Sequence, residues 1–201
     1  MVLDIGIGNG DLTKMIATNF VNLTIVDTTQ EALDNMPDRH GLWNRAVTKI
    51  LQPIETLNFQ GQTFDLIVLS HILYYVDPGI RIEIVNKLYN ILNPKGSLLL
   101  IYNSDGTRSE MVNDFNGTNF NFDQIYLNMK KFDNVIYKRI DETIEMNDLC
   151  NMLTICGVCM HDAGTTASFD DLKDYVEINF LLESSGYSMT MEQNIFFITH
   201  D

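Results

Sequence analysis

Short apolar runs alternate with amphipathic stretches along the first half of the chain. Strands rich in branched and aromatic residues are predicted at the start of the chain and at residues 23–27, 46–51, 64–70 and 97–102. The segments between them carry apolar residues at helical spacing; over residues 11–20 this face consists of Leu12, Met15, Ile16 and Phe20. The alternation predicts an α/β fold in which helices cover a mostly parallel sheet.

Polar residues mark several predicted turns and helix starts. Thr28 and Glu31 have the spacing of a capping box. Asp77 followed by Pro78 predicts the start of a helix over residues 77–92. The sequence NPKG then predicts a turn into the fifth strand.

The second half of the chain has less regular patterning. Residues 104–141 are rich in Asn, Asp and Gly and lack clean periodicity, which predicts an insertion over the functional edge of the sheet. Beyond it, the pattern predicts a helix that ends at Gly157, a strand at 158–162, a helix capped by Ser168 and a last strand at 194–200. The total is seven strands.

Length, charge and composition narrow the class of protein. A chain of 201 residues supports one well-buried core, so a single domain over residues 1–201 is expected. Its net charge of −14 argues against a nucleic-acid partner, because that binding needs Lys and Arg to neutralise phosphates. Neither a membrane-spanning run of roughly 20 apolar residues nor a secretory signal is present. Three cysteines cannot all pair, which favours a reducing, cytoplasmic location.

The sequence CGVC raises the question of a zinc or redox site. It contains Cys156 and Cys159, with Cys150 before it and His161 after it. A zinc ribbon needs a second spaced pair of ligands, which the sequence lacks. Small buried thiols on the apolar face of a helix are therefore the preferred interpretation, and no metal site is expected.

The chain opens with VLDIGIGNG, which places Asp4, Gly6, Gly8 and Gly10 between a strand and a helix. A triphosphate-binding loop would end in Gly-Lys-Ser or Gly-Lys-Thr, and this loop does not. The dinucleotide fingerprint would need its third glycine at position 11, where Asp11 would repel a pyrophosphate. The glycines still allow a neutral ribose and an amino-acid tail to approach the backbone closely.

A second acidic position follows the next strand. Asp27 ends the predicted second strand, where a carboxylate can accept hydrogen bonds from both hydroxyls of a ribose. The glycine loop with its acids and Asp27 together describe a pocket for a nucleoside that carries an ammonium group and no phosphate.

Four segments, in order, resemble the class I S-adenosylmethionine-dependent methyltransferases. They are VLDIGIGNG, IVDTT, FDLIVLSHILYYVDP and LNPKGSLLL. The resemblance implies a Rossmann-like sheet of strand order 3-2-1-4-5-7-6, helices on both faces, an antiparallel seventh strand from NIFFITHD, and S-adenosyl-L-methionine as cofactor. A narrower likeness to the histamine N-methyltransferase group rests on HILYYVDP, SLLLIYNSDG, IEMNDLCNMLTICGV and NIFFITHD. It implies a small amine as methyl acceptor; another small-molecule methyltransferase is the alternative.

The resemblance also assigns roles to residues around the cofactor. The methionine part would lie against Asp4, Gly6, Gly8 and Gly10, and the ribose against Asp27 and its neighbour Thr28. Ser70 and His71 follow the fourth strand, where the family contacts the adenine and the acceptor.

The acceptor side is assigned to aromatic and amide residues. Tyr74 and Tyr75 could stabilise a cation through their rings, worth about 0.5–2 kcal/mol, with core packing as the rival role for one of them. Gln193 or Asn194 lies where the amine-methylating relatives place an amide against the acceptor. His71 is the expected catalytic base, because the amine must lose a proton before its lone pair attacks the methyl carbon.

Two other interpretations remain open. Class I methyltransferases carry helices before their first strand that form a lid, whereas this chain starts inside that strand. A catalytically inactive, lid-less domain that serves as a binding or assembly partner, including a homodimer, is therefore the second hypothesis. A dehydrogenase is the third, and it requires that the misplaced glycine be tolerated.

Overall fold

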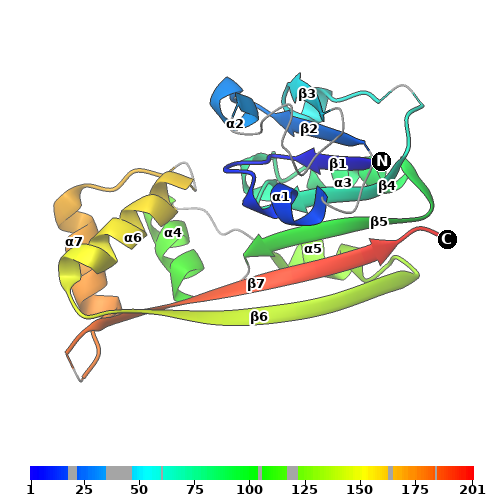
Figure 1. Cartoon of the computed structure of the whole chain (residues 1–201). Helices are drawn as coiled ribbons and strands as arrows, with labels where there is room; N and C mark the ends of the chain where they lie inside the picture. The colour runs from blue at the N-terminus through cyan, green and yellow to red at the C-terminus, as the bar shows by residue number, and fades with distance from the viewer. Residues whose placement is uncertain are drawn as a thin grey trace. The chain divides into compact units, whose positions relative to one another are not determined.

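One seven-stranded sheet organises the described part of the chain. The computed structural model describes residues 1–17, 22–34, 47–59, 61–103, 106–116, 122–162, 165–183 and 185–201. Within these ranges the strand order is β3-β2-β1-β4-β5-β7-β6 (Figure 1), which confirms the predicted fold class and order. The strands are β1 (Val2–Ile5), β2 (Leu23–Asp27), β3 (Val47–Leu51), β4 (Phe64–Ser70), β5 (Leu92–Asn103), β6 (Asn134–Met146) and β7 (Tyr187–Thr199).

The first five strands are parallel and the last strand of the chain reverses direction. β1 pairs in parallel with β2 and β4, β2 with β3, and β4 with β5. β7 runs opposite to β5 (Figure 1). The N–H of Lys95 donates to the carbonyl of His200, whose own N–H donates to Gly96. The predicted antiparallel last strand is thus confirmed.

Helices connect the strands. They are α1 (Asp11–Ala17), α2 (Gln30–Asp34), α3 (Arg81–Tyr89), α4 (Thr107–Asn116), α5 (Phe122–Met129), α6 (Leu149–Asp162) and α7 (Phe169–Asn179), with short 3₁₀ turns η1 (Ile54–Thr56) and η2 (Leu73–Tyr75). No helix in the described ranges is both long and apolar enough to cross a bilayer.

Both faces of the parallel sheet are covered. Successive residues of a strand point to opposite faces. On one face, Val2 and Val68 form a cluster to which Leu12 and Ile16 of α1 contribute. On the other face, Leu3 is also fully buried. A sheet buried on both sides explains why these strands read as continuous apolar runs.

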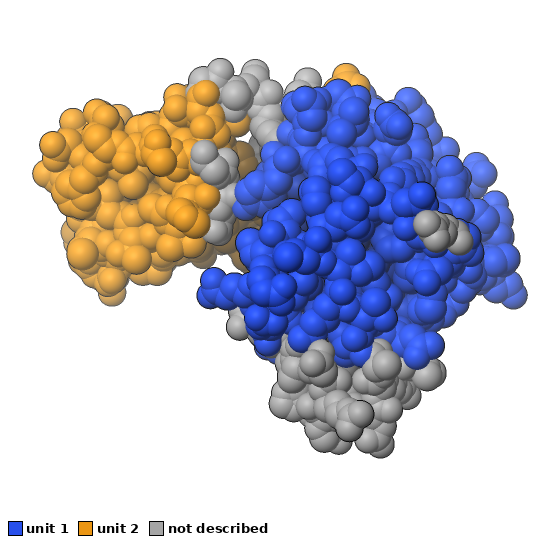
Figure 2. Space-filling view, turned by 90° about the horizontal axis from the view of Figure 1, so that it is seen from above, with its two compact units in different colours: residues 1–102, 125–137, 195–201 blue, residues 103–124, 138–194 orange. Residues whose placement is uncertain are grey.

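The chain divides into two compact units (Figure 2). The first unit comprises residues 1–102, 125–137 and 195–201, and the second comprises residues 103–124 and 138–194. Strands β6 and β7 each contribute residues to both units. The segment 104–141, expected to be an insertion, likewise contributes helix α4 to the second unit and most of α5 to the first.

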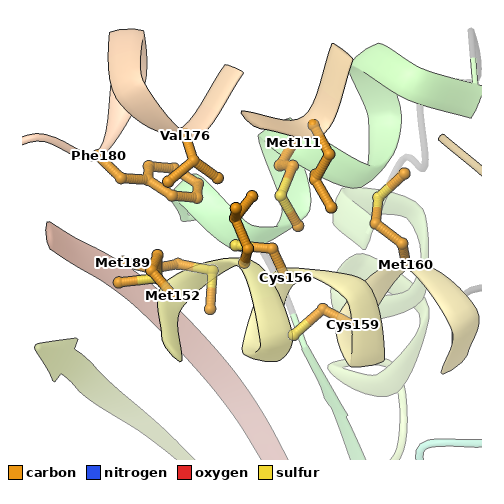
Figure 3. Packing of buried hydrophobic residues seen from close by; sticks show 10 residues of the cluster. Met111, Met152, Cys156, Cys159, Met160, Val176, Phe180 and Met189 are labelled. Carbon is orange, nitrogen blue, oxygen red and sulfur yellow. The ribbon is translucent and has the colours of Figure 1, made fainter. Parts of the chain in front are cut away.

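The second unit has a core rich in sulfur (Figure 3). Its buried residues are Met111, Met152, Leu153, Cys156, Cys159, Met160, Leu172, Val176, Phe180 and Met189. Methionine side chains adapt their shape to irregular gaps, which suits a small core built between three helices and a strand.

The structure corrects the prediction around CGVC. Helix α6 continues through Gly157 to Asp162, so neither the predicted helix end nor the strand at 158–162 exists. A glycine inside a helix costs about 1 kcal/mol, and burial of the flanking Cys156 and Met160 offsets that cost. Cys156 and Cys159 are buried, Cys150 is exposed, and desolvation raises the pKa of Cys156 to about 12. The sixth strand in chain order is instead β6, at residues 134–146, where no strand was predicted from the sequence.

Several predicted boundaries also shift. Thr29, not Thr28, caps the start of α2, because its Oγ1 accepts the N–H of Ala32 at 3.4 Å. Helix α3 starts only at Arg81, since the carboxylate of Asp77 accepts the N–H of Gly79 at 2.7 Å and forms a turn there.

The predicted NPKG turn lies inside strand β5. Lys95 has φ 65°, and the pairing of β4 with β5 shifts register between Phe64 and Leu66. The turn is therefore an irregularity within one strand.

Candidate active site

The glycine loop forms a tight turn between β1 and α1. Gly6, Gly8 and Gly10 have φ values of 74°, 52° and 75°, in the left-handed region that side chains other than glycine rarely adopt. The N–H of Gly6 donates to Val26 at 2.7 Å, and that of Gly10 donates to Ile7 at 2.8 Å. The left-handed backbone of this loop therefore favours glycine at positions 6, 8 and 10.

Two of the glycines differ in what surrounds them. A Cβ on Gly6 would lie 1.8 Å from Cδ1 of Ile72, so Gly6 packs directly under the loop that follows β4. A Cβ on Gly8 would meet nothing within 4 Å, and Gly8 is exposed. The backbone at Gly8 therefore faces open space that a ligand can enter.

Asp4 is a buried carboxylate beneath this loop. It lies on β1, is only 3% exposed, and accepts a hydrogen bond from the hydroxyl of Thr13 on α1. Desolvation, the largest cause, and the nearby charge of Asp27 raise the pKa of Asp4 to about 6, against the lowering effect of Thr13. A buried negative charge beside an exposed loop favours a ligand that carries a positive charge.

The burial of this carboxylate predicts that Asp4→Asn stabilises the chain at neutral pH. Because the folded-state pKa of about 6 exceeds the ordinary 3.8, the folded state binds more protons between these values. The stability of the wild-type chain therefore falls as pH rises from about 4 to about 6 and stays low above that. A shift of two units corresponds to about 3 kcal/mol.

Urea unfolding at pH 4 and pH 8 measures this effect. We expect Asp4→Asn to exceed the wild type in free energy of unfolding by about 2–3 kcal/mol at pH 8, and to match it at pH 4. Glu55→Gln, which neutralises an exposed carboxylate on η1, should show no such change. A difference for Asp4→Asn that is equal at both pH values would contradict the account.

Asp27 lies beside the glycine loop, as predicted. β1 and β2 pair Ile5 with Val26, so the next residues, Gly6 and Asp27, come at the same edge of the sheet. Oδ1 of Asp27 accepts the N–H and the hydroxyl of Thr29 at 2.9 and 3.0 Å. Both of these hydrogen bonds go to one oxygen, so Oδ2 is the acceptor offered to a ligand by this side chain.

His71 directly follows β4, whose end lies at the same edge of the sheet as the ends of β1 and β2. β4 ends at Ser70, which pairs with Ile101 in β5, and Ile5 of β1 pairs with Leu69. His71 has φ 57°, a left-handed conformation for a residue that is not glycine. Such strain of about 1–3 kcal/mol concentrates at functional sites.

Tyr74 fixes the orientation of the His71 ring. Nδ1 of His71 lies 3.2 Å from the hydroxyl of Tyr74, and the two rings stack with an interplanar angle of 26°. Tyr74 is half-buried, whereas the neighbouring Tyr75 is 59% exposed. Of the two tyrosines, Tyr75 therefore presents the more accessible ring.

Most of the predicted site residues come together in the first unit. Thr28 is exposed directly after β2, and Ser70 is half-buried at the end of β4. Gln193 and Asn194 lie on β7 in the second unit, half-buried and 5% exposed respectively. Their role toward an acceptor stays a prediction.

Sequence reasoning missed three neighbours of the site. Thr13 hydrogen-bonds Asp4, Ile72 covers Gly6, and Leu51 pairs with Asp27 at the end of β3 while 54% exposed. Thr13 and Ile72 carry no motif. Leu51 ends the strand predicted at residues 46–51, so its place at the same edge as Asp27 follows from the sequence, whereas its exposure is seen only in the structure.

Part of the chain also resembles known proteins in sequence. Residues 2–96 match the sequence model of a family described as a methyltransferase domain. The chain is 30% identical over 100 residues to nodulation protein S of Bradyrhizobium diazoefficiens, a match that covers 48% of this chain and 46% of that protein. The matched segment is thus less than half of the length of that relative.

Solved structures resemble the chain along its whole length. A candidate methyltransferase from Bacillus halodurans is 14% identical with a TM-score of 0.67, covering 98% of this chain and 91% of that one. The N-methyltransferase NodS of Bradyrhizobium japonicum, solved with S-adenosyl-L-homocysteine, is 15% identical with a TM-score of 0.57, covering 100% and 78%. The fold is that of the class I methyltransferases. At these identities the structural likeness shows the fold alone.

Proposed function

We propose that this protein is an S-adenosyl-L-methionine-dependent methyltransferase that acts on a small molecule, with the nitrogen of a small amine as acceptor. The observation that carries the proposal is the open backbone at Gly8, in a loop that follows Asp4 on β1 and begins at the same edge of the sheet as Asp27, within a segment that matches a methyltransferase domain. NodS, a structural relative, is described as an N-methyltransferase, which supports nitrogen as the acceptor atom.

The residues fit this cofactor better than a phosphate-containing one. S-adenosyl-L-methionine supplies an electrophilic methyl group on a positively charged sulfur. The loop between Ile5 and Leu12 contains no Lys or Arg, and the carboxylates of Asp4 and Asp27 favour positive charge. Oδ2 of Asp27 would accept a ribose hydroxyl, and the exposed Leu51 beside it offers an apolar contact for adenine.

His71 would hold the proton that the acceptor must lose. The nitrogen lone pair forms the new N–C bond as the S–C bond breaks, so the amine has to be neutral first. If Nδ1 of His71 donates to the hydroxyl of Tyr74, then Nε2 is the atom that takes this proton. Tyr75 would stabilise the cationic form of the amine or its product through its exposed ring. The residues otherwise align the reactants and exclude water.

A glycine pair provides the test. Gly8 and Gly61 both have positive φ and open space at the Cβ position. Alanine at either position costs a similar strain of about 1–2 kcal/mol, but Gly61 lies before β4, at the opposite end of the strands from the site. We expect Gly8→Ala to weaken binding of S-adenosyl-L-homocysteine at least about tenfold and Gly61→Ala to leave it unchanged.

Methyl transfer is measured on the same variants. The chain is incubated with S-adenosyl-L-methionine and a panel of small amines that includes histamine, and methylated products are detected by mass spectrometry. The wild type and Gly61→Ala should methylate the same amine, and Gly8→Ala should not. Binding of S-adenosyl-L-homocysteine without transfer to any amine would favour a different small molecule as acceptor, and absence of binding would favour the inactive binding-partner hypothesis. Equal effects of both alanines would contradict the loop assignment.

A further inference from the structure

Strand β6 is a long edge of the sheet. It contains 13 residues, from Asn134 to Met146, where about 5–6 is usual. It stands last in the strand order, and within the described ranges only β7 lies beside it (Figure 1). Ile136 is 69% exposed on this strand. An edge of this length presents N–H and C=O groups that can pair with another strand.

The sequence of β6 is complementary to itself. In an antiparallel pair centred on Ile140, which is the middle residue of the strand, Lys138 lies opposite Glu142 of a second copy. Arg139 then lies opposite Asp141, and Ile140 opposite itself. The two-fold symmetry repeats each ion pair, and directly opposed charges of unlike sign stabilise a strand pair.

Apolar residues follow the same symmetry. Centring on Ile140 also places Ile136 opposite Ile144 of the second copy. A two-fold axis perpendicular to the sheet keeps each face on its own side, so all of these pairs lie on matching faces. The pairing would cover Ile136, one of the most exposed apolar side chains of the first unit.

Neighbouring registers are unfavourable. A shift of two residues in one direction places Arg139 opposite its own copy, and a shift in the other direction does the same for Asp141. Like charges directly opposite each other destabilise a strand pair. Among these three registers the pattern therefore favours the one centred on Ile140, whereas charges that only protect an edge would have no reason to match in this way.

The net negative charge of the chain makes the charge pattern of β6 important for association between two copies. The net charge of −14 opposes contact between two copies over most of their surface. β6 combines Lys138 and Arg139 with Asp141, Glu142 and Glu145, so it is close to neutral. Arg139 already contacts Asp141 at 2.7 Å and also Glu192 of β7, which holds its guanidinium along this strand.

We propose that two copies of this chain associate through antiparallel pairing of their β6 strands about Ile140, which joins their sheets across a two-fold axis. This interface is isologous, so each copy contributes the same strand. It goes beyond the methyltransferase proposal and does not depend on it.

Charge reversal and restoration test the register. Sedimentation equilibrium of the wild-type chain should give twice the monomer mass of 23.0 kDa at micromolar concentrations. Lys138→Glu places two carboxylates opposite each other at two points, so the dimer dissociation constant should rise at least about tenfold. Adding Glu142→Lys exchanges the charges and should restore the dimer. Both side chains are exposed, and neither is part of the candidate active site.

A cross-link tests the symmetry centre separately. Ile140→Cys should form a covalent dimer under mild oxidation, because residue 140 faces its own copy. Glu142→Cys, on the same face, faces Lys138 instead and should cross-link far more slowly. Both variants carry Cys150→Ser, since Cys150 is the exposed cysteine of the chain.

The outcomes separate this interface from others. A monomeric wild type overturns the proposal. A dimer that Lys138→Glu does not weaken overturns it as well, because the contact would then lie elsewhere. Failure of Glu142→Lys to rescue Lys138→Glu, or equal cross-linking at positions 140 and 142, rules out the register centred on Ile140.

Discussion

His71→Asn is expected to lower kcat for methylation of an amine by about 10²- to 10⁴-fold, the usual contribution of a general base. Asparagine tolerates the left-handed backbone that His71 adopts at φ 57°, so the substitution removes the imidazole without adding strain. The dependence of kcat on pH in the range where histidines titrate should be lost with it. Affinity for S-adenosyl-L-homocysteine should stay within about twofold, because the proposed base acts on the acceptor.

Tyr74→Phe separates positioning from proton transfer. The hydroxyl of Tyr74 lies 3.2 Å from Nδ1 of His71 and holds the ring, but it does not take the proton in this account. The variant should therefore retain most of its pH dependence and lose only about tenfold in kcat. A His71→Asn variant with unchanged kcat at every pH would remove His71 from the catalytic role.

Asp27→Ala is expected to weaken binding of S-adenosyl-L-homocysteine by about 10- to 100-fold. Hydrogen bonds between a carboxylate and ribose hydroxyls are worth about 1.5–3 kcal/mol, and a factor of ten corresponds to about 1.4 kcal/mol. The variant also removes the acceptor for the N–H of Thr29, so its stability must be measured beside its affinity. Isothermal titration calorimetry and urea unfolding provide the two values.

Asp27→Asn is the matched variant. Its carbonyl can still accept the hydrogen bonds from Thr29, so the turn before α2 is kept. Its amide nitrogen replaces the second acceptor and the charge is lost, so affinity should fall about as far as in Asp27→Ala. Wild-type affinity in Asp27→Asn would mean that Asp27 only shapes the turn.

The sequence predicted the features of the candidate site that depend on backbone conformation. Gly6, Gly8 and Gly10 stand where φ is positive, and Asp27 lies at the edge that strand pairing brings next to Gly6. Both inferences rest on local rules: glycine permits left-handed turns, and parallel strands end at the same edge. The strand order followed from the resemblance that these motifs carry.

Packing contacts between elements could not be predicted from the sequence. Thr13 meets Asp4 only because α1 folds back on β1, and no pattern reports that contact. The strand expected at 158–162 is part of α6, because burial in the sulfur-rich core outweighs the glycine between the two cysteines. β6 was missed since an edge strand exposed on both sides shows no strict alternation of apolar and polar residues.

The central claim is that the glycine loop and Asp27 hold S-adenosyl-L-methionine. Calorimetric titration of the wild-type chain with S-adenosyl-L-homocysteine tests it most directly, with NADH as the comparison ligand. The account predicts saturable binding of one S-adenosyl-L-homocysteine per chain at micromolar concentrations and no heat from NADH. A folded chain that binds NADH, or neither ligand, would contradict it.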